Sequence, residues 1–484
     1  MGTTRSKISI SNDNVIDDLP DSYSIVPAQL GNLRSECPHN TTYKLPSTDI
    51  LSNVSGSHRE WVDITIDKIK SNKNEDCLTW KSFYKKKQNS LDELRPGISS
   101  ILPLFHEKAA SAAMVKHAMD VFLSIDKFCN PCQVPIIATD LPIYAIGKEL
   151  QWKYPTQYGE DKLVWVLGGL HCEMAAWSMV GRLLSDSGWT GIIAEADITS
   201  EGSSEALLLA SHLMKTRHAH IVTLLALEIL QNDAMVEEGV SPENREEWIT
   251  ERTKVNPTFT FWEIVKNLEI MILSAVRGIR ERNHHLYINC MEYVCYYFFS
   301  LDSTNYKRWM PVNIKDLRTL PESVENLFNQ GEWVFSKTSE PFSFIPLDHA
   351  NEHNVKVMKS SGGIVGLQQN RNLLQNWVIA SPELVRILDE FNAGIKTKKS
   401  CKTDSAAANN RLVSEVKQMV STISKYGNPF LLETNQLMTI DYHDCVDSPE
   451  ISNIKSIHEM GKKQYDDYVS NVLVKGTVSI HETI

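Results

Sequence analysis

Two short apolar segments, each followed closely by a helix-forming stretch, constrain this sequence most strongly. The first covers residues 134–139, and a helix is expected over 143–152. The second covers residues 163–167, and the helix after it is expected to end near Leu184. Repetition of strand and helix in this order is typical of a parallel or mixed sheet. The sequence therefore predicts an α/β protein rather than a simple helical bundle.

Polar residues stand directly after both apolar segments. Asp140 follows the first, and the second runs through two glycines and a leucine into His171. Because ligands bind at the carboxyl ends of parallel strands, we expect Asp140 and His171 side by side at the functional edge. Two purely structural alternatives stay open. Asp140 would then serve as a helix cap alone, and His171 would be a structural histidine, with Glu173 helping to cap its helix.

The rest of the chain is dominated by helix-forming sequence. Residues 207–299 are expected to be almost wholly helical, and they end in an aromatic run. Residues 333–335 and 342–346 are typical of short strands, and a helix is expected to begin near Asp348. The expected fold class is a helix-rich α/β protein.

Charge and composition limit the functions that this chain can have. The 49 Lys and Arg against 60 Asp and Glu give a net charge of −11, which disfavours a dedicated nucleic-acid binder. No stretch approaches the ~18 apolar residues of a membrane span, and no secretory leader opens the sequence. We expect an intracellular protein, nuclear or cytoplasmic. Gly2, in Met-Gly-Thr-Thr-Arg-Ser, fits the pattern for lipidation by a single acyl chain.

Carboxylates at the expected sheet edge suggest a metal site. Asp140 ends a strand and Glu352 starts a later helix. Hard oxygen ligands of this kind hold Mg²⁺ ions in phosphodiester chemistry, so Asp140 and Glu352 are the candidate ligands of Mg²⁺. Such pairs occur in many α/β proteins, and helix capping is the alternative for Asp140.

Basic residues give candidate contacts to a DNA backbone. Lys215 and Arg217 form a small cluster, and Lys307 and Arg308 form a second one. The alternative for the first cluster is a solvated, cationic start of a helix. His218 and His220 are two positions apart, so a helix would point them to different faces and a shared metal ion is not expected.

Six ordered segments of the chain resemble a large group of transposon-derived proteins of invertebrate animals. The similarity runs from about Leu19 to the C-terminus. The segments are Leu104–Ala110, Asp140-Leu-Pro with Gln151-Trp152, Gly168–Met174, Thr216–His220, Asn305–Trp309 and Asp348–Asn354. The group is similar to RNase H-like transposases with a helical insertion, the hAT-like arrangement.

The resemblance implies roles for particular residues. Asp140 would be the second catalytic carboxylate, His171 the histidine that follows it, and Glu352 the closing glutamate. The fold would then be a partial RNase H-like mixed sheet with a large helical insertion. The resemblance implies the first part of the core at 59–190, the insertion at 191–335 and the closing part of the core at 336–392. Composition and apolar pattern predict an extended or disordered arm at 1–58, a linker at 393–410 and a C-terminal helical region at 411–484.

Three departures from the group's pattern bear on activity. The sequence starts after the segment that would carry the first catalytic aspartate, Leu141 replaces a usual Gln, and Asn351 replaces a usual His. We therefore expect a transposon-derived protein that is catalytically inactive. An active relative would carry out metal-dependent DNA strand transfer.

Two alternative functions stay open. One is a non-catalytic interaction scaffold, in which the helical block binds a protein partner and the aromatic residues 293–299 form its core or its surface. The other is a small-molecule enzyme on an α/β sheet that uses Asp140, His171 and Glu173.

Overall fold

A computed structural model describes most of the chain. It covers residues 35–45, 50–71, 79–88, 96–97, 99, 109–131, 133–359, 406–446 and 454–482, with four isolated positions between 376 and 387. Gly2, residues 393–405 of the expected linker and most of the segment Leu104–Ala110 lie outside the described residues.

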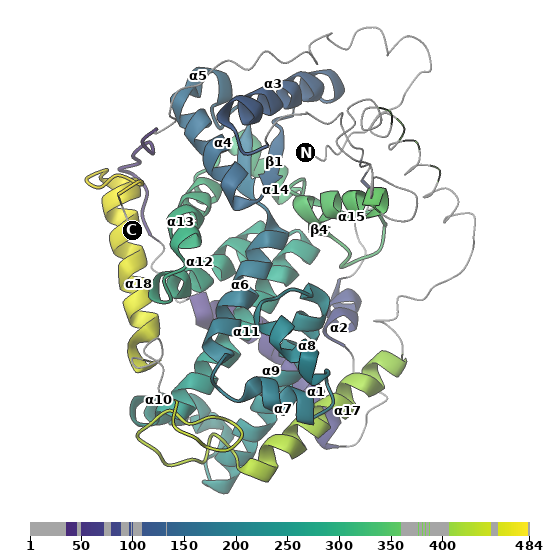
Figure 1. Ribbon diagram of the computed structural model, residues 1–484, viewed down its shortest axis with the longest axis vertical. Helices are drawn as coiled ribbons and strands as arrows, with labels where there is room; N and C mark the ends of the chain where they lie inside the picture. Colours follow the sequence, from purple (N-terminus) through teal and green to yellow (C-terminus); the bar gives the residue numbers. More distant parts are fainter. Residues whose placement is uncertain are drawn as a thin grey trace.

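Helices make up most of the described chain, as the sequence predicts. The main helices are α1 (Ile50–Lys70), α2 (Trp80–Lys87), α3 (Ala112–Cys129), α4 (Leu141–Lys153), α5 (Pro155–Tyr158), α6 (Gly169–Leu184), α7 (Trp189–Glu195), α8 (Glu201–Leu208), α9 (Leu213–Glu237), α10 (Arg245–Val255), α11 (Pro257–Glu281), α12 (His284–Ser300), α13 (Thr304–Arg318), α14 (Glu322–Asn329), α15 (Leu347–Lys359), α17 (Ala406–Tyr426) and α18 (Ile457–Tyr468). The molecule is elongated, with the strands near one end and α10 and α17 near the other (Figure 1).

Long apolar helices form the centre of the molecule. Nearly every side chain of α11 is buried, and α9 and α12 pack against it. The charged side chains that α11 buries are paired: Lys266 with Glu228 of α9 and Glu263, and Glu269 with His220 of α9. Among the described residues, α9 has the length and composition of a membrane span, and 78% of its most apolar stretch is buried inside the protein.

Within the described residues, the strands form two separate two-stranded sheets, where the sequence predicts a mixed sheet. Strands β1 (Ile136–Thr139) and β2 (Val164–Leu167) are parallel, with Thr139 opposite Leu167. Strands β3 (Val334–Phe335) and β4 (Ile345–Pro346) are antiparallel. All four residues of β2 are buried, which fits a strand that is covered on both faces.

The strand-to-helix boundaries agree with the sequence. Strand β1 is followed by α4, and β2 by α6, which ends at Leu184 as expected. Short strands and a helix at Asp348 also occur where the sequence predicts them. The element order β-α-β-α is therefore confirmed, whereas an RNase H-like sheet stays a hypothesis.

The aromatic run at the end of α12 belongs to the core. Tyr293, Tyr296, Tyr297 and Phe298 are buried, and Tyr296 lies edge-on to Tyr465 of α18 at 5.2 Å between ring centroids. These four side chains are therefore covered by the chain itself rather than presented to a partner.

The described parts of the expected arm, 35–45 and 50–58, and of the C-terminal region pack against the helical block. Helix α1 begins at Ile50, inside the expected arm, because its apolar side chains pack on α11 and α12. Cys37 and Tyr43 are buried as well. At the other end of the chain, α17 packs against α9 and α18 against α12. The predicted arm boundary at residue 58 is therefore wrong.

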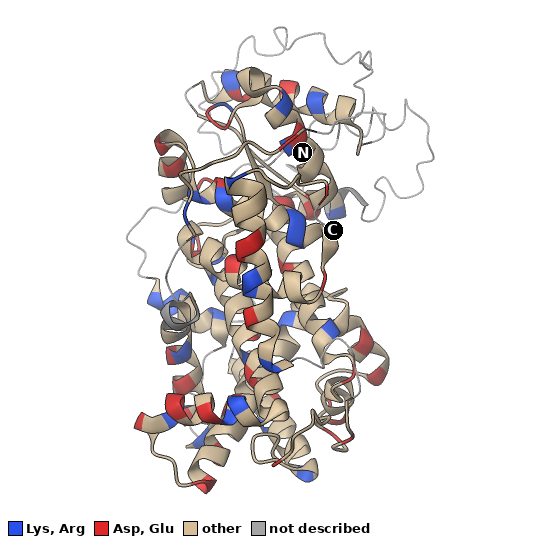
Figure 2. Ribbon diagram, turned by 90° about the vertical axis from the view of Figure 1, so that its left-hand side faces the viewer, with Lys and Arg blue, Asp and Glu red and all other residues tan. Residues whose placement is uncertain are grey.

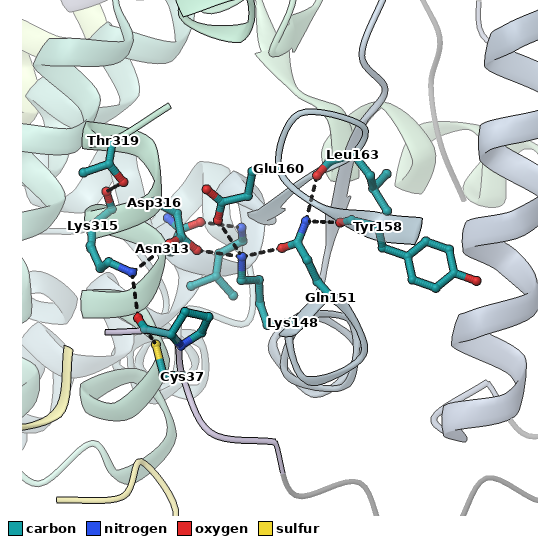
Figure 3. A network of polar contacts seen from close by, with 12 residues as sticks. Cys37, Lys148, Gln151, Tyr158, Glu160, Leu163, Asn313, Lys315, Asp316 and Thr319 are labelled. Atoms are coloured by element: carbon teal, nitrogen blue, oxygen red, sulfur yellow. Dashed lines mark hydrogen bonds and ion pairs between the residues drawn. The ribbon is translucent and has the colours of Figure 1, made fainter. Parts of the chain in front are cut away.

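A buried polar network fixes the position of β2. The Lys148 ammonium, 1% exposed, lies 2.8 Å from Asp316 of α13 and 3.1 Å from Glu160 (Figure 3). Asn313 of the same helix accepts a hydrogen bond from the backbone N–H of Leu167, the last residue of β2. Burying an ammonium requires paired carboxylates, so these contacts tie α4, α13 and β2 into one unit.

Candidate functional site

The ends of β1 and β2 place Asp140 and His171 at one edge of the parallel pair. Asp140 is the N-cap residue of α4, but its side chain makes no capping hydrogen bond. Gly168 is the N-cap of α6 and has no side chain to donate or accept. His171 follows in the first turn of α6. Both side chains therefore occupy the edge that the sequence predicts.

Asp348 of α15 takes over the capping of α6. Its carboxylate accepts hydrogen bonds from the backbone N–H groups of Leu170 at 3.1 Å and His171 at 3.3 Å. It also lies 2.9 Å from Nδ1 of the His171 ring and accepts from the backbone N–H of His349 at 3.0 Å. The first N–H groups of a helix lack partners within the helix, and a carboxylate there is stabilised by the helix dipole.

Gly168 makes this close approach possible. A Cβ atom at this position would lie 2.3 Å from Oδ2 of Asp348 and 3.0 Å from the carbonyl oxygen of Thr139. The glycine therefore allows α15 and the end of β1 to meet the start of α6, a close backbone approach that a larger residue would block.

Electrostatics at the edge favour a protonated His171. The hydrogen bond to Asp348 raises the pKa of His171, and the nearby negative charges of Asp348, Asp140 and Glu352 raise it further. Partial burial lowers the pKa of His171, but the net shift is upward. The His171 side chain is 38% exposed. Oδ1 of Asp140 is buried and has no hydrogen-bond partner among the described residues. The edge thus combines one oriented imidazole with one unsatisfied carboxylate oxygen.

Glu352 lies on the exposed side of α15. Its influence on the pKa of His171 places it near the edge, but its side chain is exposed to solvent. His349 and His353 of the same helix are neighbours, with ring centroids 4.6 Å apart. Burial lowers the pKa of His349 to about 4, so this imidazole stays neutral at neutral pH.

The described carboxylates at this edge do not by themselves make a site for a pair of Mg²⁺ ions. Within the described chain, no group of three or more His, Cys, Asp or Glu side chains gathers closely enough to hold a metal ion. Two-metal chemistry needs carboxylates that share the ions. Asp348 is already engaged in hydrogen bonds, which leaves Asp140 and Glu352, the two predicted ligands, without a third.

Other segments that carry the resemblance converge on the same region. Trp152 of α4 stacks on Trp309 of α13 at 5.8 Å between ring centroids. The hydroxyl of Tyr306 donates to the carbonyl oxygen of His171 at 3.2 Å. Segments that are far apart in the sequence therefore support one edge, and several of their residues act through packing.

Arg217 is not the solvated cation that the sequence suggests. It is buried, and its guanidinium binds the Glu173 carboxylate in a bidentate pair at 2.8 and 2.6 Å. Trp177 donates to the same carboxylate at 3.1 Å. The Glu173 carboxylate is therefore occupied by Arg217 and Trp177, and it serves neither as a helix cap nor as a site residue at the sheet edge.

The remaining DNA-contact candidates have varied surroundings. Lys215 is exposed in the first turn of α9. Lys307 is paired with Asp302, and the Arg308 side chain is half-buried. His218 and His220 bind different carboxylates, Glu415 and Glu269, as their spacing predicts.

Acidic and basic residues are interspersed over the described helices. In the view of Figure 2, Lys and Arg alternate with Asp and Glu along the helices, and the described residues form no continuous basic stripe there. A basic stripe is the usual footprint of a DNA-binding surface.

The residue that sequence reasoning missed is Asp348. An aspartate in the first turn of a helix normally stabilises its own helix. The sequence therefore gives no sign that Asp348 of α15 caps α6. The one available signal was its place at the start of a segment that also contains Glu352.

Fold and site together define a helix-rich α/β protein with an Asp–His pair at the end of a parallel strand pair. The chain belongs to the family described as a domain of unknown function, DUF8702, whose model matches residues 79–253 and 241–481. No curated protein and no solved structure matches the chain.

Proposed function

We propose that this chain is a transposon-derived relative of RNase H-like transposases that no longer carries out metal-dependent strand transfer. The order of strand, Asp140, helix, strand, His171, helical block and Glu352 supports the ancestry. In this proposal, residues between α6 and β3 correspond to the helical insertion. The sheet edge has kept its architecture and lost its metal chemistry.

One observation carries the proposal. Asp348, the carboxylate in contact with His171, directs both oxygens at N–H groups: Oδ1 accepts from Leu170 and His349, and Oδ2 accepts from Leu170 and from the backbone and ring of His171. A carboxylate that caps a helix in this way has little capacity left to bind a cation. The role of the edge is then structural, because Asp348 holds the start of α15 against the start of α6.

Metal binding and DNA cleavage test this proposal. We expect titration of the full chain with Mn²⁺ to give no stoichiometric binding, and a labelled DNA duplex to stay intact with Mg²⁺ or Mn²⁺. The matched variants are Asp140→Ala and Glu352→Ala, which should behave as the parent chain does. Cleavage that depends on Mn²⁺ and disappears in both variants would overturn the proposal.

A second candidate function rests on the orientation of His171. Binding of Nδ1 by Asp348 fixes the ring and raises its pKa, which is how carboxylates prepare a histidine for proton transfer. This candidate is the small-molecule enzyme considered from the sequence, with Asp348 instead of Glu173 beside His171. We then expect a hydrolase or isomerase activity that His171→Gln abolishes while the melting temperature changes little. Activity against a panel of ester and phosphoester substrates that persists in His171→Gln would contradict it.

A further inference from the structure

A large pocket is lined by residues of five helices. It has a volume of about 920 Å³, and its lining comes from α2, α8, α9 and α17, with Arg280 of α11 at its wall. Small-molecule sites in proteins typically have volumes of roughly 300–1,000 Å³, so the pocket is large enough for a ligand. None of the predicted site residues at the sheet edge lines it.

The charged side chains that line the pocket from the described part of the chain all have the same sign. No carboxylate of the described chain lines it, although the whole chain carries a net charge of −11. The permanently cationic lining residues are Lys81, Lys215, Arg217, Arg280 and Arg411. The carboxylates of Glu173 and Glu415 pair with Arg217 and Arg411 but do not line the pocket. An anion in the pocket would therefore meet cations and no acidic side chain of the described chain.

Four helices begin at this pocket. Thr79 and Trp80 stand at the start of α2, Ser200 is the N-cap of α8, Lys215 is in the first turn of α9, and Ala407 is in the first turn of α17. The unbonded N–H groups of a helix start carry a partial positive charge that favours anions. The start of α2 is capped by the Thr79 hydroxyl, which accepts from the backbone N–H of Ser82, whereas the Ser200 side chain forms no capping hydrogen bond with α8.

Independent support comes from Trp80 and Arg280. Trp80 is 3% exposed, lines the pocket, and its indole N–H has no hydrogen-bond partner among the described residues. A buried donor without an acceptor is costly, and an anionic oxygen would satisfy it. The guanidinium of Arg280 lies over the Trp80 ring at 5.7 Å, which holds this cation at the wall.

The remainder of the lining is mainly aliphatic. It includes Ile198, Leu207, Met214, Ile221 and Leu412. A free inorganic anion would leave this apolar surface without a partner. An aliphatic chain or ring would pack against it and be removed from water, which is favourable.

We propose that this pocket binds an amphipathic organic anion, with a phosphate or carboxylate head at the cations and helix starts and an aliphatic body against the apolar wall. The head group would accept from Lys215 and from the indole N–H of Trp80. Lys215 suits this role because it lines the pocket and its side chain is exposed in the first turn of α9.

Calorimetric titration of the full chain with dodecyl phosphate, below its micelle concentration, tests the proposal. We expect one site, an affinity at least about tenfold higher than for inorganic phosphate, and weaker binding as salt is added. Dodecanoate in a parallel titration shows which head group is preferred. Dodecanol, which lacks the charge, should bind at least about tenfold more weakly than the better of the two anions.

Two charge-introducing variants locate the site. Lys215→Glu and Met214→Glu place a carboxylate at exposed lining positions and should each weaken binding of dodecyl phosphate about tenfold or more. Lys417→Glu makes the same charge change on α17 at an exposed residue outside the lining and should leave binding within about twofold. Circular dichroism of each variant checks that the fold is retained.

Several results would overturn the proposal. Absence of binding by both amphipathic anions excludes this ligand class. Equal binding of dodecanol shows that the cations play no part. Binding that both lining variants leave unchanged, or that Lys417→Glu weakens as much, places the ligand elsewhere on the chain.

Discussion

His171 and Asp348 are 177 positions apart in the chain, and their side chains meet at 2.9 Å. The contact joins the first turn of α6 to the first turn of α15. The same carboxylate binds the backbone N–H groups of Leu170 and His171, because Gly168 at the N-cap has no side chain. One aspartate thus caps a helix that begins far away in the sequence.

Removal of this cap should destabilise the protein. Asp348→Ala leaves the backbone N–H groups of Leu170, His171 and His349 and the His171 ring without this acceptor. We expect a loss of about 1–3 kcal/mol in the free energy of unfolding. Urea denaturation followed by circular dichroism measures the loss. Glu352→Ala on the exposed side of the same helix is the matched control and should change stability by less than about 0.5 kcal/mol. Equal effects of the two variants would show that the cap contributes nothing special.

The pH dependence of stability should reveal the raised pKa of His171. Because the folded pKa lies above the ordinary value of 6.5, protonation favours the folded state. The stabilisation is complete below pH 6.5 and is lost as the pH rises through the folded pKa. We expect the stability difference between the parent chain and His171→Gln to shrink over that interval, by less than about 1 kcal/mol since the ring is partly solvent-screened. A difference that grows with pH would contradict the assignment.

Local features of the fold were predictable from the sequence, and the partners across the fold were not. The apolar segments before Asp140 and Gly168 predict β1 and β2, because a strand and the helix after it depend on neighbouring residues. The capping of α6 by Asp348 depends on how α15 packs, which no local pattern encodes. For the same reason, the expected mixed sheet could not be derived from the strands alone.

The burial of Arg217 likewise could not be predicted from its local sequence. In the sequence it stands between Lys215 and His218 and looks like a member of a solvated cluster. Its burial follows from the packing of α9 against its neighbours, which brings Glu173 of α6 within hydrogen-bond distance. The cationic pocket was equally hidden, because its lining comes from five helices that span residues 79 to 412.

The buried pair of Arg217 and Glu173 gives a third prediction. Arg217→Ala should cost about 3–5 kcal/mol, because the carboxylate of Glu173 stays buried without its partner. The double variant Arg217→Met with Glu173→Gln should cost less than the single variant, since the amide can still accept from Trp177 and no charge is left unpaired. Denaturant unfolding of Arg217→Met, Glu173→Gln and their double variant measures the coupling between the two side chains.

A surface pair supplies the control for this cycle. Lys425 and Glu195 lie 2.8 Å apart, with side chains 59% and 37% exposed. Lys425→Ala should cost at most about 1 kcal/mol, because solvent screens the pair. If Arg217→Ala costs as little as this, the buried pair is not a structural element.

Two helical glycines test how closely α6 and α8 must pack. A Cβ at Gly181 of α6 would lie 1.9 Å from the carbonyl oxygen of Leu208, a backbone atom that cannot turn aside. Gly181→Ala should therefore destabilise the protein by about 1–3 kcal/mol through overpacking. At Gly202 of α8 nothing lies within 4 Å of the added Cβ, so Gly202→Ala should be neutral or stabilise by up to about 1 kcal/mol through better helix propensity. Thermal and urea unfolding of the two variants measure the contrast, and a Gly181→Ala protein as stable as its parent would show that the two helices can separate at little cost.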